Sequence, residues 1–115
     1  KISTLVTELT DLPVIVLNSH THFDYMGGNA EFQDILAMDS DYTKRNMKGY
    51  ANDIMRNEVS DEAICSVLPD GIAPETHHIA PFFTKELIRD GHKINLGNRV
   101  EYVFDGFSLI MRSPL

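Results

Sequence analysis

One short apolar run, residues 14–17 with the sequence VIVL, constrains the fold more than any other segment of this 115-residue chain. Its mostly β-branched residues lie between Pro13 and the polar pair Asn18-Ser19 and do not alternate with polar ones, which is typical of a strand buried on both faces. The preceding residues 2–11 have the spacing of an amphipathic helix, with an apolar stripe formed by Ile2, Leu5, Val6 and Leu9. A helix followed by a buried strand and a polar loop indicates an α/β fold.

The middle of the chain continues this alternation. A second strand is expected at residues 34–39, and residues 41–58 are helical by propensity, with an interruption at Gly49. One more helical turn is expected at residues 62–68. The proline-rich residues 69–81 are predicted to form a surface loop.

The last third of the chain changes its period. Residues 86–104 alternate apolar and polar side chains around two turn signals, Asp90-Gly91 and Gly97-Asn98. This pattern predicts consecutive antiparallel strands joined by tight hairpins, and residues 108–111 are a final strand candidate. We therefore expect one α/β (α+β) domain over residues 1–115, with a mixed sheet, helices on one face and a C-terminal β-meander.

Composition excludes several classes of function. The chain has 10 Lys and Arg against 17 Asp and Glu, a formal net charge of -7, which suits divalent cations better than nucleic acid. Cys65 is the only cysteine, so no intrachain disulfide or cysteine-based zinc knuckle is possible, in agreement with a reducing compartment. No signal-peptide pattern and no apolar run of ~20 residues is present. We expect a soluble cytoplasmic protein that binds neither nucleic acid nor membrane.

The residues that could perform chemistry follow the first predicted strand. His20, His22 and Asp24 occupy alternate positions, so in an extended segment their side chains point to the same side. Ligands of α/β sheets bind at the carboxyl ends of the strands. Two imidazoles and a carboxylate suit zinc, and also iron or manganese. Gly27 and Gly28, just behind them, would leave space for a substrate and supply backbone N–H groups.

The segment SHTHFDYMGG resembles the His-x-His-x-Asp-His signature of the metallo-β-lactamase superfamily, and its flanks agree: a preceding apolar strand and a following Gly-Gly-Asn. A weaker match is LIRDGHKINLGNRVEYVF, which resembles a hairpin of that family. The resemblance covers residues 1–104, about the first half of a typical member. It implies half of an αββα sandwich and a hydrolase in which metal-activated water attacks a carbonyl or phosphoryl centre.

Carried over residue by residue, the resemblance gives an incomplete site. His20 and His22 match ligands of one metal, and Asp24 matches a ligand of a second metal. Tyr25 stands where the second metal's histidine is expected, and a neutral phenol is a poor replacement. Phe107 occupies the position of a third histidine and cannot coordinate. Three ligands divided between two metals are too few to hold either in the manner of the family.

Two functions follow from this reading. The first is a degenerate metallo-β-lactamase-like protein, at most a weak metal-dependent hydrolase, with zinc favoured over iron or manganese and with His20, His22 and Asp24 at the metal. The alternative is a catalytically inactive module that binds a small molecule or a protein, holds no metal and keeps only the fold. A third reading is a piece of a complete hydrolase.

Other polar residues have competing interpretations. His77-His78 are either substitute metal ligands or solvated loop residues, and Tyr25 either acts on a substrate or only packs its ring. Cys65 is expected in the core, on an apolar helical stripe. Ser40 or Asp41 is expected to cap the helix that follows, and the pair Asp39 and Asp41 is expected to serve in capping rather than as an acid/base pair.

Half of a sandwich would leave an apolar sheet face exposed, well beyond an ordinary surface patch. The simplest cover is a second copy of the chain, so a homodimer with two-fold symmetry is expected, with the apolar residues FSLIM at positions 107–111 contributing. A monomer whose own helices fold over the sheet is the alternative.

Overall fold

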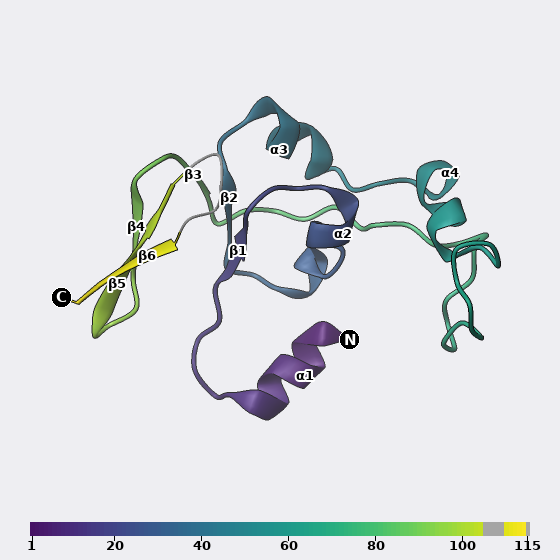
Figure 1. Cartoon of the computed structure of the whole chain (residues 1–115), viewed down its shortest axis with the longest axis horizontal. Helices are drawn as coiled ribbons and strands as arrows, with labels where there is room; N and C mark the ends of the chain where they lie inside the picture. Colours follow the sequence, from purple (N-terminus) through teal and green to yellow (C-terminus); the bar gives the residue numbers. More distant parts are fainter. Residues whose placement is uncertain (105–109, 115) are drawn as a thin grey trace.

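The computed structural model describes residues 1–104 and the backbone of residues 110–114. In this part of the chain the strands form two three-stranded sheets, one parallel with the order β1-β2-β3 and one antiparallel with the order β4-β5-β6 (Figure 1). The strands are β1 (Val16–Asn18), β2 (Ile35–Met38), β3 (Glu86–Ile88), β4 (His92–Asn95), β5 (Arg99–Val103) and β6 (Ile110–Pro114). The predicted combination of helices with strands is confirmed.

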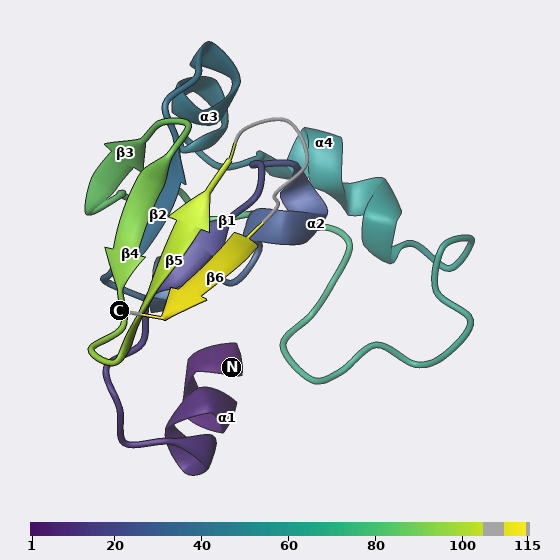
Figure 2. The ribbon, with the colours of Figure 1, turned by 60° about the vertical axis from the view of Figure 1, so that its left-hand side comes forward.

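The central strand β2 separates two apolar clusters, because successive side chains of a strand point to opposite faces. On one face, Ile35 packs with Met26 and Phe82. On the other face, Leu36 packs with Ile88 and with Val103 of the antiparallel sheet. The parallel sheet is therefore covered on both faces, by helices and loops on one side and by the second sheet on the other (Figures 1 and 2).

The prediction for residues 86–104 is partly wrong. The hairpin from β4 to β5 is confirmed, with His92 opposite Val103 and Gly97 at φ 89° in the turn. However, β3 pairs in parallel with β2, and Asp90-Gly91 leads the chain into the other sheet, so the expected single mixed sheet is two sheets. The alternation of side chains records which face of a strand is buried, but it does not select the neighbouring strand.

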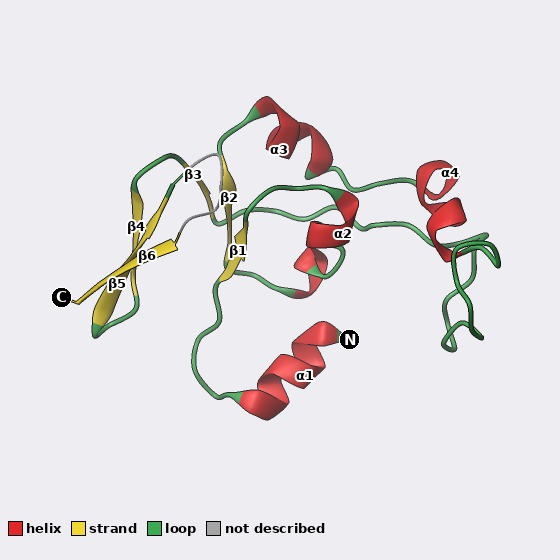
Figure 3. Ribbon diagram, viewed as in Figure 1, coloured by secondary structure: helices red, strands yellow, loops and turns green. Residues whose placement is uncertain are grey.

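The helices lie outside the two sheets, and α4 lies at the far side of the molecule from the antiparallel sheet (Figure 3). They are α1 (Ile2–Leu9), α2 (Phe23–Met26), α3 (Asp41–Asn46) and α4 (Asn52–Met55), with 3₁₀ turns η1 (Asn29–Glu31) and η2 (Arg56–Val59). In the described part of the chain, no helix has the length and apolar character needed to cross a membrane.

The predicted interruption at Gly49 is confirmed and has a steric cause. Gly49 has φ 81°, and a Cβ atom there would lie 2.2 Å from the carbonyl oxygen of Ile79. That close approach belongs to an antiparallel bridge in which Tyr50 and Ile79 exchange backbone hydrogen bonds of 3.0 and 2.9 Å. The bridge ties the long predicted loop, residues 69–81, back to the segment between α3 and α4.

The predicted helical turn at residues 62–68 is wrong. After η2 the chain makes only a hydrogen-bonded turn, in which the N–H of Ile64 donates to the carbonyl of Ser60 over 2.9 Å. Cys65, expected in the core, is exposed. Cys65 and Val67 of this segment are exposed, and without packing so short a helix is not stable.

The helix α1 is confirmed, but its apolar stripe is not buried. Leu5 is 59% exposed and Leu9 is 85% exposed. The helix is held near its N-terminus, where the backbone N–H and hydroxyl of Ser3 donate to Glu31 over 2.9 and 2.8 Å. These hydrogen bonds hold the pKa of Glu31 below its ordinary value.

Among residues 1–104, the strands do not present the large apolar face that was expected to need a second copy of the chain. The parallel sheet is covered on both faces, and none of the large apolar side chains that are strongly exposed lies in strands β1 to β5. The outer face of β4 and β5 is partly polar, with Lys93 over the ring of Tyr102 at 5.5 Å. Exposed apolar side chains gather instead on α1 and the segment after it, at Ile2, Leu5, Leu9, Leu12 and Ile15.

Candidate functional site

The candidate site lies in the loop that follows β1, at the carboxyl edge of the parallel sheet. His20 is in this loop, His22 is the N-cap of α2, and Asp24 lies in the first turn of α2. The prediction that all three residues share one extended segment is therefore wrong for Asp24. The backbone turns at His22, whose carbonyl accepts a 2.9 Å hydrogen bond from the N–H of Tyr25.

The helical turn brings His22 and Asp24 into contact. His22 Nδ1 lies 2.8 Å from Asp24 Oδ1, and both side chains are about half exposed. An ionised carboxylate can only accept hydrogen bonds, so Nδ1 is the donor in this contact. His20 has its Nδ1 3.2 Å from the hydroxyl of Ser19. Within residues 1–104, neither Nε2 atom has a hydrogen-bond partner.

The two imidazole rings lie near each other. Their centroids are 6.4 Å apart with an angle of 28° between the ring planes. Two imidazoles bound through Nε2 to one tetrahedral zinc ion would have centroids about 5 Å apart, given Zn–N distances of about 2.0–2.1 Å. The two rings are therefore about 1 Å farther apart than a shared zinc ion would place them. His20 also contacts the ring of Tyr25, with 4.0 Å between centroids, so the exposed phenol lies on the imidazole rather than against Asp24.

Buried polar side chains hold the backbone of this loop. Thr21, between the two histidines, is completely buried, and its carbonyl accepts hydrogen bonds from Asn46 Nδ2 at 3.0 Å and from the Tyr50 hydroxyl at 3.1 Å. Burial, followed by a hydrogen bond with Tyr42, raises the pKa of Tyr50, so its hydroxyl stays protonated and can donate. These hydrogen bonds fix the loop backbone on its buried side, while the two imidazoles face solvent.

A second buried pair fixes the far end of the loop. Asn18 closes β1, and its side-chain amide donates to the carbonyl of Tyr25 over 3.2 Å. Asn29, also buried, hydrogen-bonds with Asn18. Sequence reasoning missed the supporting roles of Asn18, Asn29 and Thr21. The available signal was an asparagine at each end of the histidine segment, one closing the apolar run and one following Gly-Gly.

The two glycines take less part in the site than expected. Gly27 and Gly28 have φ of -57° and -96°, so neither needs the left-handed region for a sharp turn. A Cβ atom on Gly28 would lie 2.9 Å from Cγ2 of Ile2, whereas one on Gly27 would meet only ordinary contacts. Gly28 therefore makes room for α1 rather than for a substrate.

The other candidate ligands make local contacts elsewhere. The carbonyl of His77 accepts from Asn52 Nδ2 over 2.8 Å, and Nδ1 of His78 lies 2.9 Å from the carbonyl of Thr76. Across residues 1–104, no group of three or more His, Cys, Asp or Glu side chains is placed to hold a metal ion. Phe107, which was expected at the position of a third histidine, lies outside the described residues.

The expectation that Ser40 caps the following helix is confirmed, since its hydroxyl accepts from the N–H of Thr43 over 3.1 Å. The expectation that Asp39 takes part in capping is wrong. Asp39 instead pairs with Lys44 at 2.7 Å and with Arg89 at 2.9 Å. Both cations hold the pKa of the Asp39 carboxyl below its ordinary value, and Lys44 has the larger effect.

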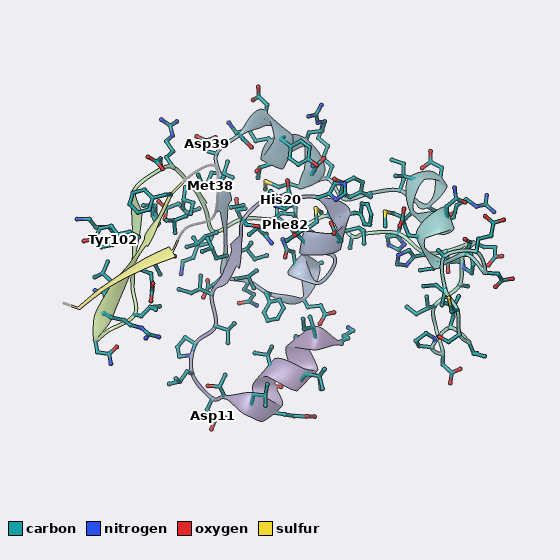
Figure 4. The ribbon with its side chains drawn as sticks, viewed as in Figure 1. Asp11, His20, Met38, Asp39, Phe82 and Tyr102 are labelled. Carbon is teal, nitrogen blue, oxygen red and sulfur yellow. The ribbon has the colours of Figure 1, made fainter. Side chains whose placement is uncertain are left out.

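Figure 4 shows His20 and Asp39 at the same end of the parallel sheet. Compared with protein-family models, with curated proteins and with solved structures, the chain matches none. The functional assignment therefore depends on the geometry of this edge and on the resemblance of the histidine motif.

Proposed function

We propose that this chain is a degenerate metallo-β-lactamase-like protein in which His20 and His22 bind one zinc ion through their Nε2 atoms. When bound, zinc supplies a Lewis acid that activates water for attack on a carbonyl or phosphoryl centre. The observation that carries the proposal is that both imidazoles have the same hydrogen-bonding arrangement. Each has Nδ1 next to an oxygen, and each Nε2 has no partner within residues 1–104.

That arrangement supports metal binding for a chemical reason. Histidine ligands in proteins commonly donate the N–H of the other ring nitrogen to a carboxylate or carbonyl, which fixes the ring and raises its basicity. Asp24 is placed to do this for His22, at 2.8 Å. In this proposal Asp24 orients His22 as well as adding negative charge beside the ion. Its expected role as a direct ligand would require it to leave that contact.

Two imidazoles fill only half of the roughly four positions that zinc uses in proteins. We therefore expect weak binding, and weak hydrolysis at most. The ring centroids of Tyr25 and His20 are 4.0 Å apart, and the Tyr25 hydroxyl would donate a hydrogen bond to a bound substrate. The fixed carbonyl of Thr21 keeps the two histidines in register when no ion is present.

Zinc titration tests the proposal. The untagged protein is freed of metal with a chelator and titrated with zinc in a calorimeter, and the same titration is run on His20→Ala and His22→Ala. We expect one zinc per chain and a loss of binding in both variants. His78→Ala is the matched control, because His78 is also exposed, in a loop, with its Nδ1 on an oxygen at 2.9 Å. Equal binding by all variants would refute the proposal.

A second candidate is a protein-binding module without catalysis, and the exposed apolar stripe of α1 favours it. Leu5 and Leu9 are mostly exposed although the helix is amphipathic. A homodimer formed through this stripe is the form of the proposal that needs no other protein. Light scattering after size exclusion tests it: the dimer predicts twice the chain mass, reduced to one chain mass in Leu5→Lys. A monomer at all concentrations would exclude the homodimer.

A further inference from the structure

The two histidines of the candidate site are exposed ligands of an incomplete metal site. His20 is exposed, and the side chain of His22 is 48% exposed. In the part of the chain that the structure describes, no group of three or more His, Cys, Asp or Glu side chains is placed to hold a metal ion. Structural zinc sites have about four protein ligands, and catalytic zinc sites have about three. One copy of the chain therefore supplies fewer ligands than either kind of site uses.

The surroundings of the two imidazoles leave their outer side open to another molecule. Tyr25 packs on His20 with 4.0 Å between ring centroids, and Phe23 packs on His22 with 4.5 Å between centroids. The backbone between the histidines is held on the opposite, buried side, at Thr21. Tyr25 is 55% exposed, so a partner that contacts the imidazoles would also cover an aromatic ring.

The charge of the site makes contact between two copies of the chain depend on a cation. Asp24 is about half exposed, and its Oδ1 lies 2.8 Å from Nδ1 of His22, so each copy brings a carboxylate to this surface. Two chains with a net charge of -7 repel each other. A divalent cation between the imidazoles would be attracted to both Asp24 carboxylates and would offset that repulsion where the chains meet.

We propose that two copies of this chain share one zinc ion, to which each copy contributes His20 and His22, with the ion on a two-fold axis. This inference rests on the proposed function for the identity of the ligands and adds to it a partner and a form of regulation. Two-fold symmetry gives both copies the same contacts and is the commonest symmetry of homo-oligomers. Four imidazoles complete a tetrahedral zinc site and leave no position for water. The shared ion is therefore structural, and hydrolysis is confined to chains that hold an ion alone.

Mass action makes this dimer appear and then disappear as zinc is added. At one zinc ion per two chains, each bound ion can recruit a second chain. With zinc in excess, each chain holds its own ion, in agreement with the one zinc per chain that the proposed function expects at saturation. A maximum of the dimer at intermediate zinc is therefore the signature of a shared ion.

Sedimentation equilibrium tests the inference on the untagged protein after a chelator has removed metal. The mass is measured without zinc, at one zinc ion per two chains, and with zinc in large excess. We expect the mass to double at the intermediate ratio and to return to the zinc-free value in excess. Leu5→Lys, which removes a dimer formed through α1, should show the same doubling. His20→Ala and His22→Ala should each abolish it, whereas the matched control His78→Ala should keep it, because His78 is an exposed loop histidine outside the site.

The outcomes separate this inference from the proposed function. A constant mass, in a protein that still binds one zinc ion per chain, would overturn this inference and leave the proposed function intact. A protein that binds no zinc would overturn both. Doubling that persists in His20→Ala or His22→Ala, doubling that is lost in His78→Ala, or a mass that rises steadily up to excess zinc would each overturn the shared site alone.

Discussion

The two hydrogen bonds to the carbonyl of Thr21 give a quantitative test of how the histidine loop is stabilised. This carbonyl is buried and accepts two hydrogen bonds, from Asn46 and from Tyr50. Tyr50→Phe removes one donor and leaves the ring in place. Asn46→Ala removes the other donor. The double variant leaves the carbonyl without either donor, so the three variants and the native chain form a double-mutant cycle.

The expected energies follow from the two kinds of loss. Removing one donor while the other remains should cost about 1 kcal/mol, the usual net contribution of a hydrogen bond, with a further cost for the space left by Asn46. Removing both adds the penalty for a buried carbonyl without a partner, about 1–3 kcal/mol. The double variant should therefore lose at least about 1 kcal/mol more than the two single losses combined.

Urea unfolding measures the cycle, with the slope of each transition checked for constancy. Tyr102→Phe is a control, since Tyr102 lies on the other sheet and contacts Lys93 rather than the loop. Zinc affinity should fall in the double variant and change little in Tyr50→Phe. A coupling within about 0.3 kcal/mol of zero would refute the reasoning, because independent sites add to within that margin.

Three further predictions concern Gly49, Asp39 and Asp24. Gly49→Ala should destabilise the chain by about 3 kcal/mol or more in thermal unfolding, because a Cβ atom there meets a backbone oxygen at 2.2 Å; Gly71→Ala, at φ 85° with nothing within 4 Å, should cost about 1 kcal/mol. Folding lowers the pKa of Asp39, so its contribution is complete above about pH 3.8 and lost as pH falls through the lower folded value; Asp39→Asn should flatten the stability profile in that range, and an unchanged profile would contradict it. Asp24→Asn should weaken zinc binding about tenfold, the effect of losing a partner of a histidine ligand, and equal affinity would show that Asp24 does not act on His22.

Features set by local pattern were predictable from the sequence. The apolar run before Asn18 predicted β1, the spacing of Leu5 and Leu9 predicted α1, and Gly97 predicted the hairpin between β4 and β5. Each depends on neighbours in the chain. The pairing of β3 with β2 was not predictable in this way, because it is decided by which strand edge stays open after the chain has passed through the loops and helices of residues 39–85.

The candidate site was also predictable from the sequence only in part. The position of His20 and His22 at a strand end followed from the order of residues. The turn that returns Asp24 to His22 did not, because a motif read as extended gives no sign of where a helix begins. The support of Thr21 by Asn46 and Tyr50 is a long-range contact between uncharged polar residues, and such residues look like ordinary surface positions in a sequence.

Sharing β2 between the two apolar clusters makes the molecule cooperative. Ile35 and Leu36 are adjacent in the chain but belong to different clusters, so loosening this strand opens both at once. Neither sheet can unfold while the other stays folded, because the two sheets pack apolar side chains against each other. The amide protons of β2 should be the last to exchange with solvent, at the free energy of global unfolding.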